Sequence, residues 1–135
     1  MRRQPATVLI ADDDPDSRAI LRELLLFQGR AVLEAVDGLE CVMMAVLRAP
    51  DLIVLDLLMP GMDGWQAAAV LKADPGTSDI PILALTADVA PAHRDRALLA
   101  GCDFVASKPI EPRQLAHEID ALYIRTRARI HAGAA

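Results

Sequence analysis

The sequence has few cysteines, few aromatic residues and no long apolar run. Cys41 and Cys102 stand far apart and lack the close spacing of a zinc site, so we expect reduced thiols that fill the core. No apolar stretch approaches the roughly 20 residues that cross a bilayer, and the first ten residues lack a separate hydrophobic segment before a cleavage site. We therefore expect a cytoplasmic protein with no membrane partner.

Positive charge is also scarce. The 135 residues include 14 Lys and Arg against 19 Asp and Glu, which gives a formal net charge of -5. Such a chain has no general basic field to hold nucleic acid, so we expect no nucleic-acid partner. With 53% hydrophobic residues, a chain of this length can bury the core of one domain.

Short apolar runs alternate with helical patterns along the chain. The expected strands are 7–11, 30–36, 51–56, 82–87 and 103–107, and the expected helices are 16–28, 37–49, 65–74, 91–100 and from 113 onward. Pro15 suits the first turn of a helix and Gly29 its end, while Gly61 and Gly64 permit positive φ in the turn MPGMDG. The alternation predicts an open α/β domain with a parallel sheet covered on both faces.

Polar residues stand where several of these strands end. Asp12 and Asp13 follow the first strand, Asp56 ends the third, Thr86 lies at the end of the fourth, and Lys108 follows the fifth. Working groups of open parallel sheets lie at this edge. Clustered carboxylates repel one another unless a cation shares the site, and Mg²⁺ prefers such oxygen ligands. With a hydroxyl and a lysine nearby, Asp56 is equipped to attack phosphorus and form an acyl phosphate.

Four blocks, LIADDD, DLIVLDLLMPGMDG, ILALTA and SKPI, resemble the receiver domain of two-component response regulators in order and spacing. The resemblance covers about residues 6–124. We expect a receiver domain over residues 1–124, followed over 125–135 by the end of the last helix and a disordered tail, HAGAA, at residues 131–135. The resemblance implies a flavodoxin-like (βα)5 fold, with a doubly wound parallel five-stranded sheet of strand order 2-1-3-4-5. No output module follows, so we expect a single-domain phosphoacceptor switch rather than an enzyme.

The resemblance also implies roles for individual residues. Asp56 would accept a phosphoryl group from a histidine kinase or a histidine phosphotransfer protein. Mg²⁺ would be held by three carboxylates and one backbone carbonyl, those of Asp12, Asp13, Asp56 and Leu58, with Asp12 binding it directly or through water. The phosphoryl group would be bound by Thr86, Ala87 and Lys108, with Thr86 and Lys108 assisting the transfer. The Lys108–Pro109 peptide bond would be cis.

Two positions depart from the family pattern. Val105 stands three residues before the lysine, where the family commonly has an aromatic switch residue, and Phe104 would face the opposite side of its strand. Leu58 stands two residues after Asp56, at a position that is often polar. An apolar side chain there should restrain attacking water, so we expect a long-lived acyl phosphate.

The output of such a switch would be a protein surface. We expect it on the fourth helix, fifth strand and fifth helix, facing an unidentified downstream protein, and this face or the last helix could also pair two copies in a homodimer. One alternative is a phosphate-independent scaffold. Another is a phosphatase of the haloacid dehalogenase type with Asp12 as nucleophile and Asp14 as acid. For Asp14 we favour a helix N-cap, with Asp16 in the first turn.

Overall fold

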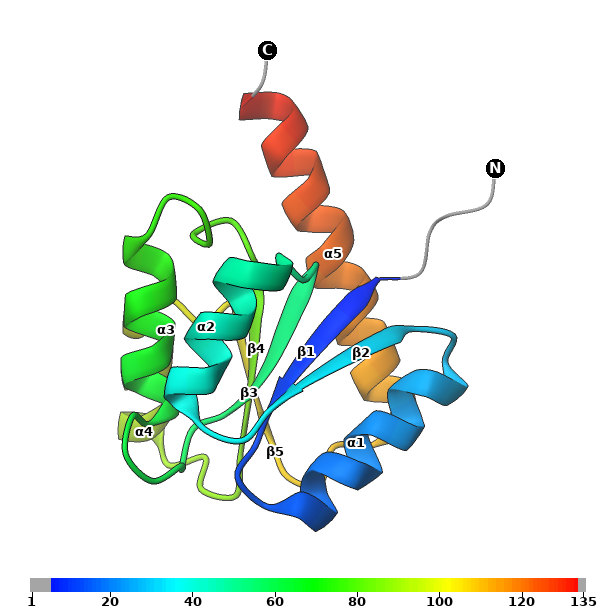
Figure 1. Ribbon diagram of the computed structural model, residues 1–135, viewed down its shortest axis with the longest axis vertical. Helices are drawn as coiled ribbons and strands as arrows, with labels where there is room; N and C mark the ends of the chain where they lie inside the picture. The colour runs from blue at the N-terminus through cyan, green and yellow to red at the C-terminus, as the bar shows by residue number, and fades with distance from the viewer. Residues whose placement is uncertain (1–5, 134–135) are drawn as a thin grey trace.

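The computed structural model describes residues 6–133, which form five strands, each followed by a helix (Figure 1). The strands are β1 (Thr7–Ala11), β2 (Ala31–Ala35), β3 (Leu52–Asp56), β4 (Ile82–Thr86) and β5 (Phe104–Ser107). The helices are α1 (Pro15–Phe27), α2 (Gly38–Arg48), α3 (Gly64–Ala73), α4 (Pro91–Ala100) and α5 (Pro112–Gly133). The predicted elements are confirmed, and the bounds that differ do so by one residue, as element ends commonly do.

The sheet is parallel and its strand order is 2-1-3-4-5, which confirms the flavodoxin-like prediction. In this order β1 has β2 on one side and β3 on the other, so Leu9 pairs with both Leu33 and Ile53. The chain therefore reverses its direction of winding at the β1–β3 pair. In open α/β sheets the crevice for ligands lies beyond the carboxyl ends of the strands at such a point.

Helices cover both faces of the sheet (Figure 1). On one face Ile53 and Leu55 pack with residues of α2, α3 and α4 in a single buried cluster. On the other face Val8, Ile10 and Val54 pack with α1 and α5. The central strands are buried on both faces, which explains why their sequences are apolar runs rather than alternating patterns.

Both cysteines belong to the core. Cys41 and Cys102 are buried and free, and burial, together with a nearby aspartate in each case, raises the pKa of each thiol to about 12. The thiols therefore stay protonated at neutral pH and act as small apolar groups. Among residues 6–133, no helix combines the length and the apolar character that crossing a membrane requires.

Three aspartates begin helices. Asp14, Asp37 and Asp63 each accept a hydrogen bond from a backbone N–H of the following first turn, and Asp63 forms a capping box with Gln66. Asp14 is thus an N-cap, as predicted. Because α1 and α3 begin next to the carboxyl ends of β1 and β3, these caps also fix the loops at that edge.

The last helix is longer than the sheet requires. Leu115, Ile119, Leu122 and Thr126 form its buried stripe, whereas every side chain over 127–132 is exposed and this end projects beyond the amino ends of the strands (Figure 1). Residues 131–133, expected in a disordered tail, continue the helix, since no proline or glycine interrupts it before Gly133. Residues 134–135 lie outside the described residues.

Candidate functional site

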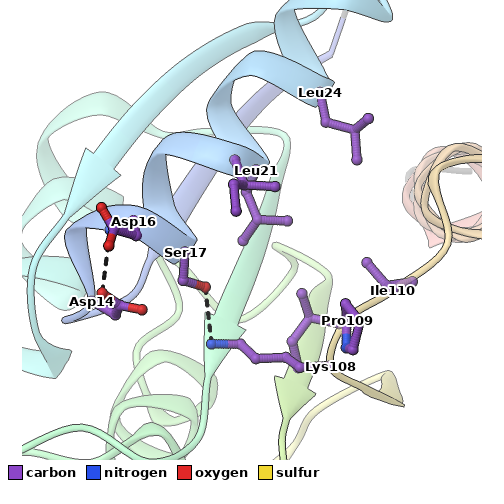
Figure 2. Close-up of a pocket in the computed structure, with 10 residues that line it drawn as sticks. Asp14, Asp16, Ser17, Leu21, Leu24, Lys108, Pro109 and Ile110 are labelled. Carbon is purple, nitrogen blue, oxygen red and sulfur yellow. Dashed lines mark hydrogen bonds between the residues drawn. The ribbon is translucent and has the colours of Figure 1, made fainter.

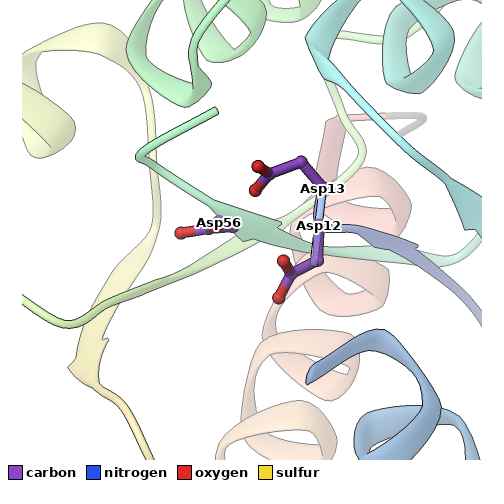
Figure 3. Close-up of side chains that lie close together, drawn as sticks. All are labelled: Asp12, Asp13 and Asp56. Carbon is purple, nitrogen blue, oxygen red and sulfur yellow. The ribbon is translucent and has the colours of Figure 1, made fainter. Parts of the chain in front are cut away.

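Three carboxylates meet at the carboxyl ends of β1 and β3 (Figure 3). Asp12, Asp13 and Asp56 each offer an oxygen, and these oxygens lie within 4.8 Å of one another. Asp12 is 1% exposed and Asp56 is 7% exposed, whereas Asp13 is open to solvent. Three carboxylate oxygens at this spacing are the donor set of a hard divalent cation such as Mg²⁺, so the residues fit the expected metal.

Asp12 is held through all of its oxygens. Its Oδ1 accepts a hydrogen bond from the Asp14 N–H at 2.9 Å, and its Oδ2 accepts from Ser17 Oγ at 2.7 Å and from Lys108 Nζ at 2.8 Å. The Asp12 carbonyl accepts from Arg18 Nη1 at 2.8 Å. Burial alone would raise the pKa of Asp12, but the hydrogen bonds from Lys108, Ser17 and Asp14 outweigh it and lower the pKa below its usual value.

Asp56 has fewer partners than Asp12. Its Oδ2 lies 3.5 Å from Lys108 Nζ, and its Oδ1 accepts a hydrogen bond from the Leu58 N–H at 3.3 Å. Burial, with added repulsion from Asp12 and Asp13, raises the pKa of Asp56 to about 6 although Lys108 and the Leu58 N–H oppose the rise. Without a cation, Asp56 is therefore harder to ionise than Asp12.

Lys108 reaches this cluster from the loop after β5. Its backbone N–H donates to the Thr86 carbonyl at 2.9 Å, and the Lys108–Pro109 peptide bond is cis, as expected. Burial would lower the pKa of the ammonium, but Asp12 and Asp56 outweigh it and raise the pKa. One positive charge from β5 thus stands between carboxylates from β1 and β3.

Thr86 ends β4, beside the strand that carries Asp56. It is one residue beyond Leu85, the partner of Asp56 in the β3–β4 pair, and it is 1% exposed. Its Oγ1 accepts a hydrogen bond from the Asp88 N–H at 3.1 Å, and the structure gives its hydroxyl proton no acceptor among residues 6–133. The proton is therefore available for a new acceptor. Ala87, the next residue, is exposed at the same edge.

Gly64, at the start of α3, lies against the backbone of the strand that carries Asp56. A Cβ on Gly64 would stand 2.5 Å from the Asp56 carbonyl oxygen and 2.6 Å from Leu57 Cα, while the Gly64 N–H donates to the Leu57 carbonyl at 2.9 Å. Of the two glycines expected to permit positive φ, Gly61 has φ +70°, but Gly64 does not have positive φ. Gly64 is needed instead because two backbones come close together.

The fifth strand separates its two candidate switch positions. Val105 is buried in the cluster beneath α3 and α4, and Phe104 packs in the cluster on the opposite face. The expectation that Phe104 faces away from the Val105 side is confirmed. In the same buried cluster as Val105, the Trp65 indole donates to the His93 carbonyl at 3.2 Å, and the Arg96 guanidinium lies 4.3 Å from the centre of the indole ring.

A pocket of about 340 Å³ adjoins the acidic cluster (Figure 2). It lies between α1 and the segment that follows β5, with Ser17 and Lys108 at its polar end and Leu21, Leu24 and Ile110 along its sides. Lys108 is therefore accessible from the α1 side of the molecule.

The structure brings together Asp12, Asp13, Asp56 and Lys108, all predicted from the sequence, and places Thr86 on the neighbouring strand. Leu58 meets the cluster through its N–H, and its side chain is 49% exposed. Three contributing residues were not predicted: Ser17, Arg18 and, in its actual role, Gly64. For Ser17 the only signal in the sequence is a hydroxyl in the first turn of the helix after the aspartates, a pattern that also occurs without function.

The fold and site define a doubly wound α/β protein with an acidic cluster where the strand order reverses. Residues 8–120 match the family model of the response regulator receiver domain, and the chain belongs to this family. It is therefore a receiver domain of the two-component type.

Relatives of known sequence and structure agree with this assignment. The chain is 38% identical over 120 residues to the phosphate regulon transcriptional regulatory protein PhoB of Pseudomonas aeruginosa, covering 89% of this chain and 52% of that protein. It is also 38% identical over 120 residues to the response regulator MprA of Mycobacterium leprae, with the same coverage of 89% and 52%. The chain thus spans about half the length of these curated relatives.

Two solved structures are similar over nearly their whole length. A putative response regulator from Chloroflexus aurantiacus has a TM-score of 0.85 at 30% identity, covering 90% of this chain and 99% of that one. The receiver domain of the sensor histidine kinase PA1611 from Pseudomonas aeruginosa has a TM-score of 0.83 at 26% identity, covering 89% and 98%. That receiver has a magnesium ion coordinated in its active-site cleft.

Proposed function

We propose that this receiver is a phosphorylation-dependent switch whose phosphoacceptor is Asp56. The observation that carries the proposal is the position of Asp56: a nearly buried carboxylate at the end of β3, grouped with Asp12 and Asp13 and 3.5 Å from the Lys108 ammonium. A carboxylate so placed has both a cation site and a fixed positive charge to balance incoming phosphoryl oxygens. Membership of the receiver family supports the same role.

Mg²⁺ is the cofactor that the donor set fits. Asp12, Asp13 and Asp56 would hold it together with the carbonyl of Leu58, and the ion when bound would neutralise charge on the phosphoryl oxygens. The magnesium ion in the similar PA1611 receiver supports this choice. Because both carboxylate oxygens of Asp12 already accept hydrogen bonds, Asp13 and Asp56 have the freer oxygens for direct coordination.

The chain's own residues then divide the chemistry. A carboxylate oxygen of Asp56 attacks phosphorus, and the bond from phosphorus to the imidazole nitrogen of a histidine kinase or histidine phosphotransfer protein breaks. Lys108 pairs with the transferred group through its ammonium, and Thr86 donates its free hydroxyl proton to a phosphoryl oxygen. Ala87, next to Thr86, has a small side chain, so it does not block the approach of the phosphodonor from solvent.

The output would pass through a protein surface and not through catalysis. We place it on α4, β5 and α5, since Thr86 leads directly into the loop before α4. The downstream partner would be a cytoplasmic protein, with a second copy of the chain as a possible further partner on this face or along α5. Several curated relatives are transcriptional regulators, but the chain spans only about half of their length, so no nucleic-acid binding is proposed for it.

Treatment with Mg²⁺ and acetyl phosphate, followed by intact-mass measurement, tests the proposal. Wild-type protein should gain the mass of one phosphoryl group, Asp56→Asn should gain none, and Asp14→Asn should behave as wild type because Asp14 caps α1. Steady hydrolysis that survives Asp56→Asn but is lost in Asp12→Asn would favour the phosphatase alternative. No modification of wild-type protein would favour the scaffold.

A further inference from the structure

We propose that Ser17 is a positioning residue of this site, which aims the ammonium of Lys108 at Asp56. The inference rests on the proposed function of Asp56 and adds a residue to it. Ser17 Oγ donates to Asp12 Oδ2 at 2.7 Å and accepts from Lys108 Nζ at 3.2 Å, while Lys108 Nζ donates to the same Asp12 oxygen at 2.8 Å. The three groups form a closed triangle of hydrogen bonds, one side of which Figure 2 shows.

Counting the N–H groups of Lys108 shows what the triangle achieves. A lysine ammonium has three donors and no acceptor, and two of them are taken by Asp12 and Ser17. One N–H remains, and the next carboxylate oxygen, Asp56 Oδ2, lies 3.5 Å from Nζ. Asp12 alone would hold the ammonium at one point about which it can turn, whereas Asp12 and Ser17 together leave one direction open.

The hydroxyl of Ser17 suits this role better than a charged group would. The hydroxyl donates one hydrogen bond to Asp12 and accepts one from Lys108, so it links an anion and a cation without adding charge to the cluster. Its backbone is fixed as well, since α1 begins at Pro15 behind the Asp14 cap. Arg18, the next residue, donates to the Asp12 carbonyl at 2.8 Å and ties the same turn to β1.

The pocket beside Lys108 offers its ammonium an alternative position away from Asp56. The space of about 340 Å³ between α1 and the segment after β5 begins at Ser17 and Lys108, and Lys108 has a side chain that is 22% exposed. A four-carbon side chain freed from Ser17 can turn into this space and away from Asp56. Ser17 therefore keeps Lys108 on the Asp56 side of the pocket before any phosphoryl group arrives.

Variants that differ only in the hydroxyl test the inference. Threonine and valine have nearly the same shape, so Ser17→Thr and Ser17→Val impose the same branching on α1 and differ in the hydrogen bonds. With acetyl phosphate and Mg²⁺, Ser17→Val should be phosphorylated on Asp56 at least about tenfold more slowly than Ser17→Thr, because valine loses the hydrogen bonds to both Asp12 and Lys108 and one hydrogen bond to a charged group is already worth about tenfold. Ser17→Ala should match Ser17→Val. Equal rates for all variants would overturn the inference.

A double-mutant cycle separates positioning of Lys108 from a general effect on the site. Ser17→Ala should slow phosphorylation in the wild-type background and have little further effect in Lys108→Gln, because Ser17 acts through Lys108. An equal loss in both backgrounds would show that Ser17 does not act through Lys108.

A second measurement needs no phosphorylation: NMR relaxation of the Lys108 side chain should show greater mobility in Ser17→Val than in Ser17→Thr. If wild-type protein takes no phosphate while Ser17→Val and Ser17→Thr still differ in Lys108 mobility, the function of Asp56 would be refuted and the positioning role of Ser17 would stand.

Discussion

Lys108 pairs with Asp12 at 2.8 Å across 96 positions of sequence, and this pairing divides the acidic cluster into unequal parts. Asp12 takes the shorter contact and has a lowered pKa, whereas Asp56, 3.5 Å from the same ammonium, has a pKa raised to about 6. Before phosphorylation, the site therefore stabilises the ionised form of Asp12 after β1 and disfavours the ionised form of Asp56 at the end of β3.

Asp56→Asn should stabilise the metal-free protein at high pH. A carboxyl with a folded-state pKa near 6 and an unfolded value near 4 favours folding at low pH, and this contribution is lost as the pH rises from about 4 through 6. Asparagine does not ionise, so the variant should exceed wild type by about 2 to 3 kcal/mol at pH 8, with the gap closing toward pH 4. Urea unfolding in EDTA at several pH values measures this. A gap that does not change with pH would contradict the assignment, and Asp14→Asn is the control.

Gly64→Ala should disrupt the base of the site. The new Cβ would meet the Asp56 carbonyl oxygen at 2.5 Å, and both groups belong to backbone that cannot turn aside. We expect a loss of about 2 to 3 kcal/mol in the free energy of unfolding, the usual cost of overpacking. Gly76→Ala is the matched control, since its Cβ would meet only the Asp74 carboxylate at 3.4 Å. Similar losses for the two variants would refute the close-approach explanation.

Leu58→Asn should shorten the life of the acyl phosphate. The Leu58 N–H donates to Asp56 Oδ1 at 3.3 Å, so its side chain stands at the edge of the site, half exposed and unable to bind water. An amide there can hold an attacking water, and we expect dephosphorylation to be about fivefold faster, the effect of one ordinary hydrogen bond. Loss of the phosphoryl mass after removal of the donor gives the rate. Leu58→Met should resemble wild type, and equal rates for Leu58→Asn and wild type would count against a shielding role.

Tryptophan emission from Trp65 should report a movement of the Thr86 hydroxyl. The Thr86 hydroxyl accepts from the Asp88 N–H, the Asp88 carboxylate lies 3.1 Å from His93 Nδ1, and the His93 ring packs edge-on against the Trp65 indole. When the Thr86 hydroxyl turns toward a phosphoryl group, we expect this chain of contacts to shift. Tryptophan emission should change on phosphorylation in wild type and Thr86→Ser but not in Thr86→Ala. A full change in phosphorylated Thr86→Ala would exclude this route.

The sequence predicts the elements of this fold well because the central strands are buried on both faces. Ile53, Val54 and Leu55 form a continuous apolar run that ends at Asp56, and such a run marks a strand and its end at once. The order of the strands in the sheet cannot be predicted in this way, because an apolar run does not indicate which strands lie beside it. The prediction of the order 2-1-3-4-5 rests on the resemblance to a family.

The site was predictable only in part. Carboxylates at strand ends are visible in sequence because the edge of a parallel sheet collects them, and this identifies Asp12, Asp13 and Asp56 as neighbours. The preference of Lys108 for Asp12 depends on side-chain direction across three strands, which no local pattern records. The turn-like sequence around Gly64 predicts a positive φ, whereas the actual constraint on Gly64 comes from the backbone of Asp56 and Leu57.

The projecting end of α5 makes the protein convenient to label. It extends past the amino ends of the strands, whereas Asp56 and Lys108 lie at the carboxyl ends, so the length of the sheet, about 17 Å for strands of five residues, separates them (Figure 1). A dye or surface tether attached at exposed Ala132 would leave the acidic cluster and the pocket beside it uncovered. Immobilised molecules could then meet a phosphodonor as freely as molecules in solution.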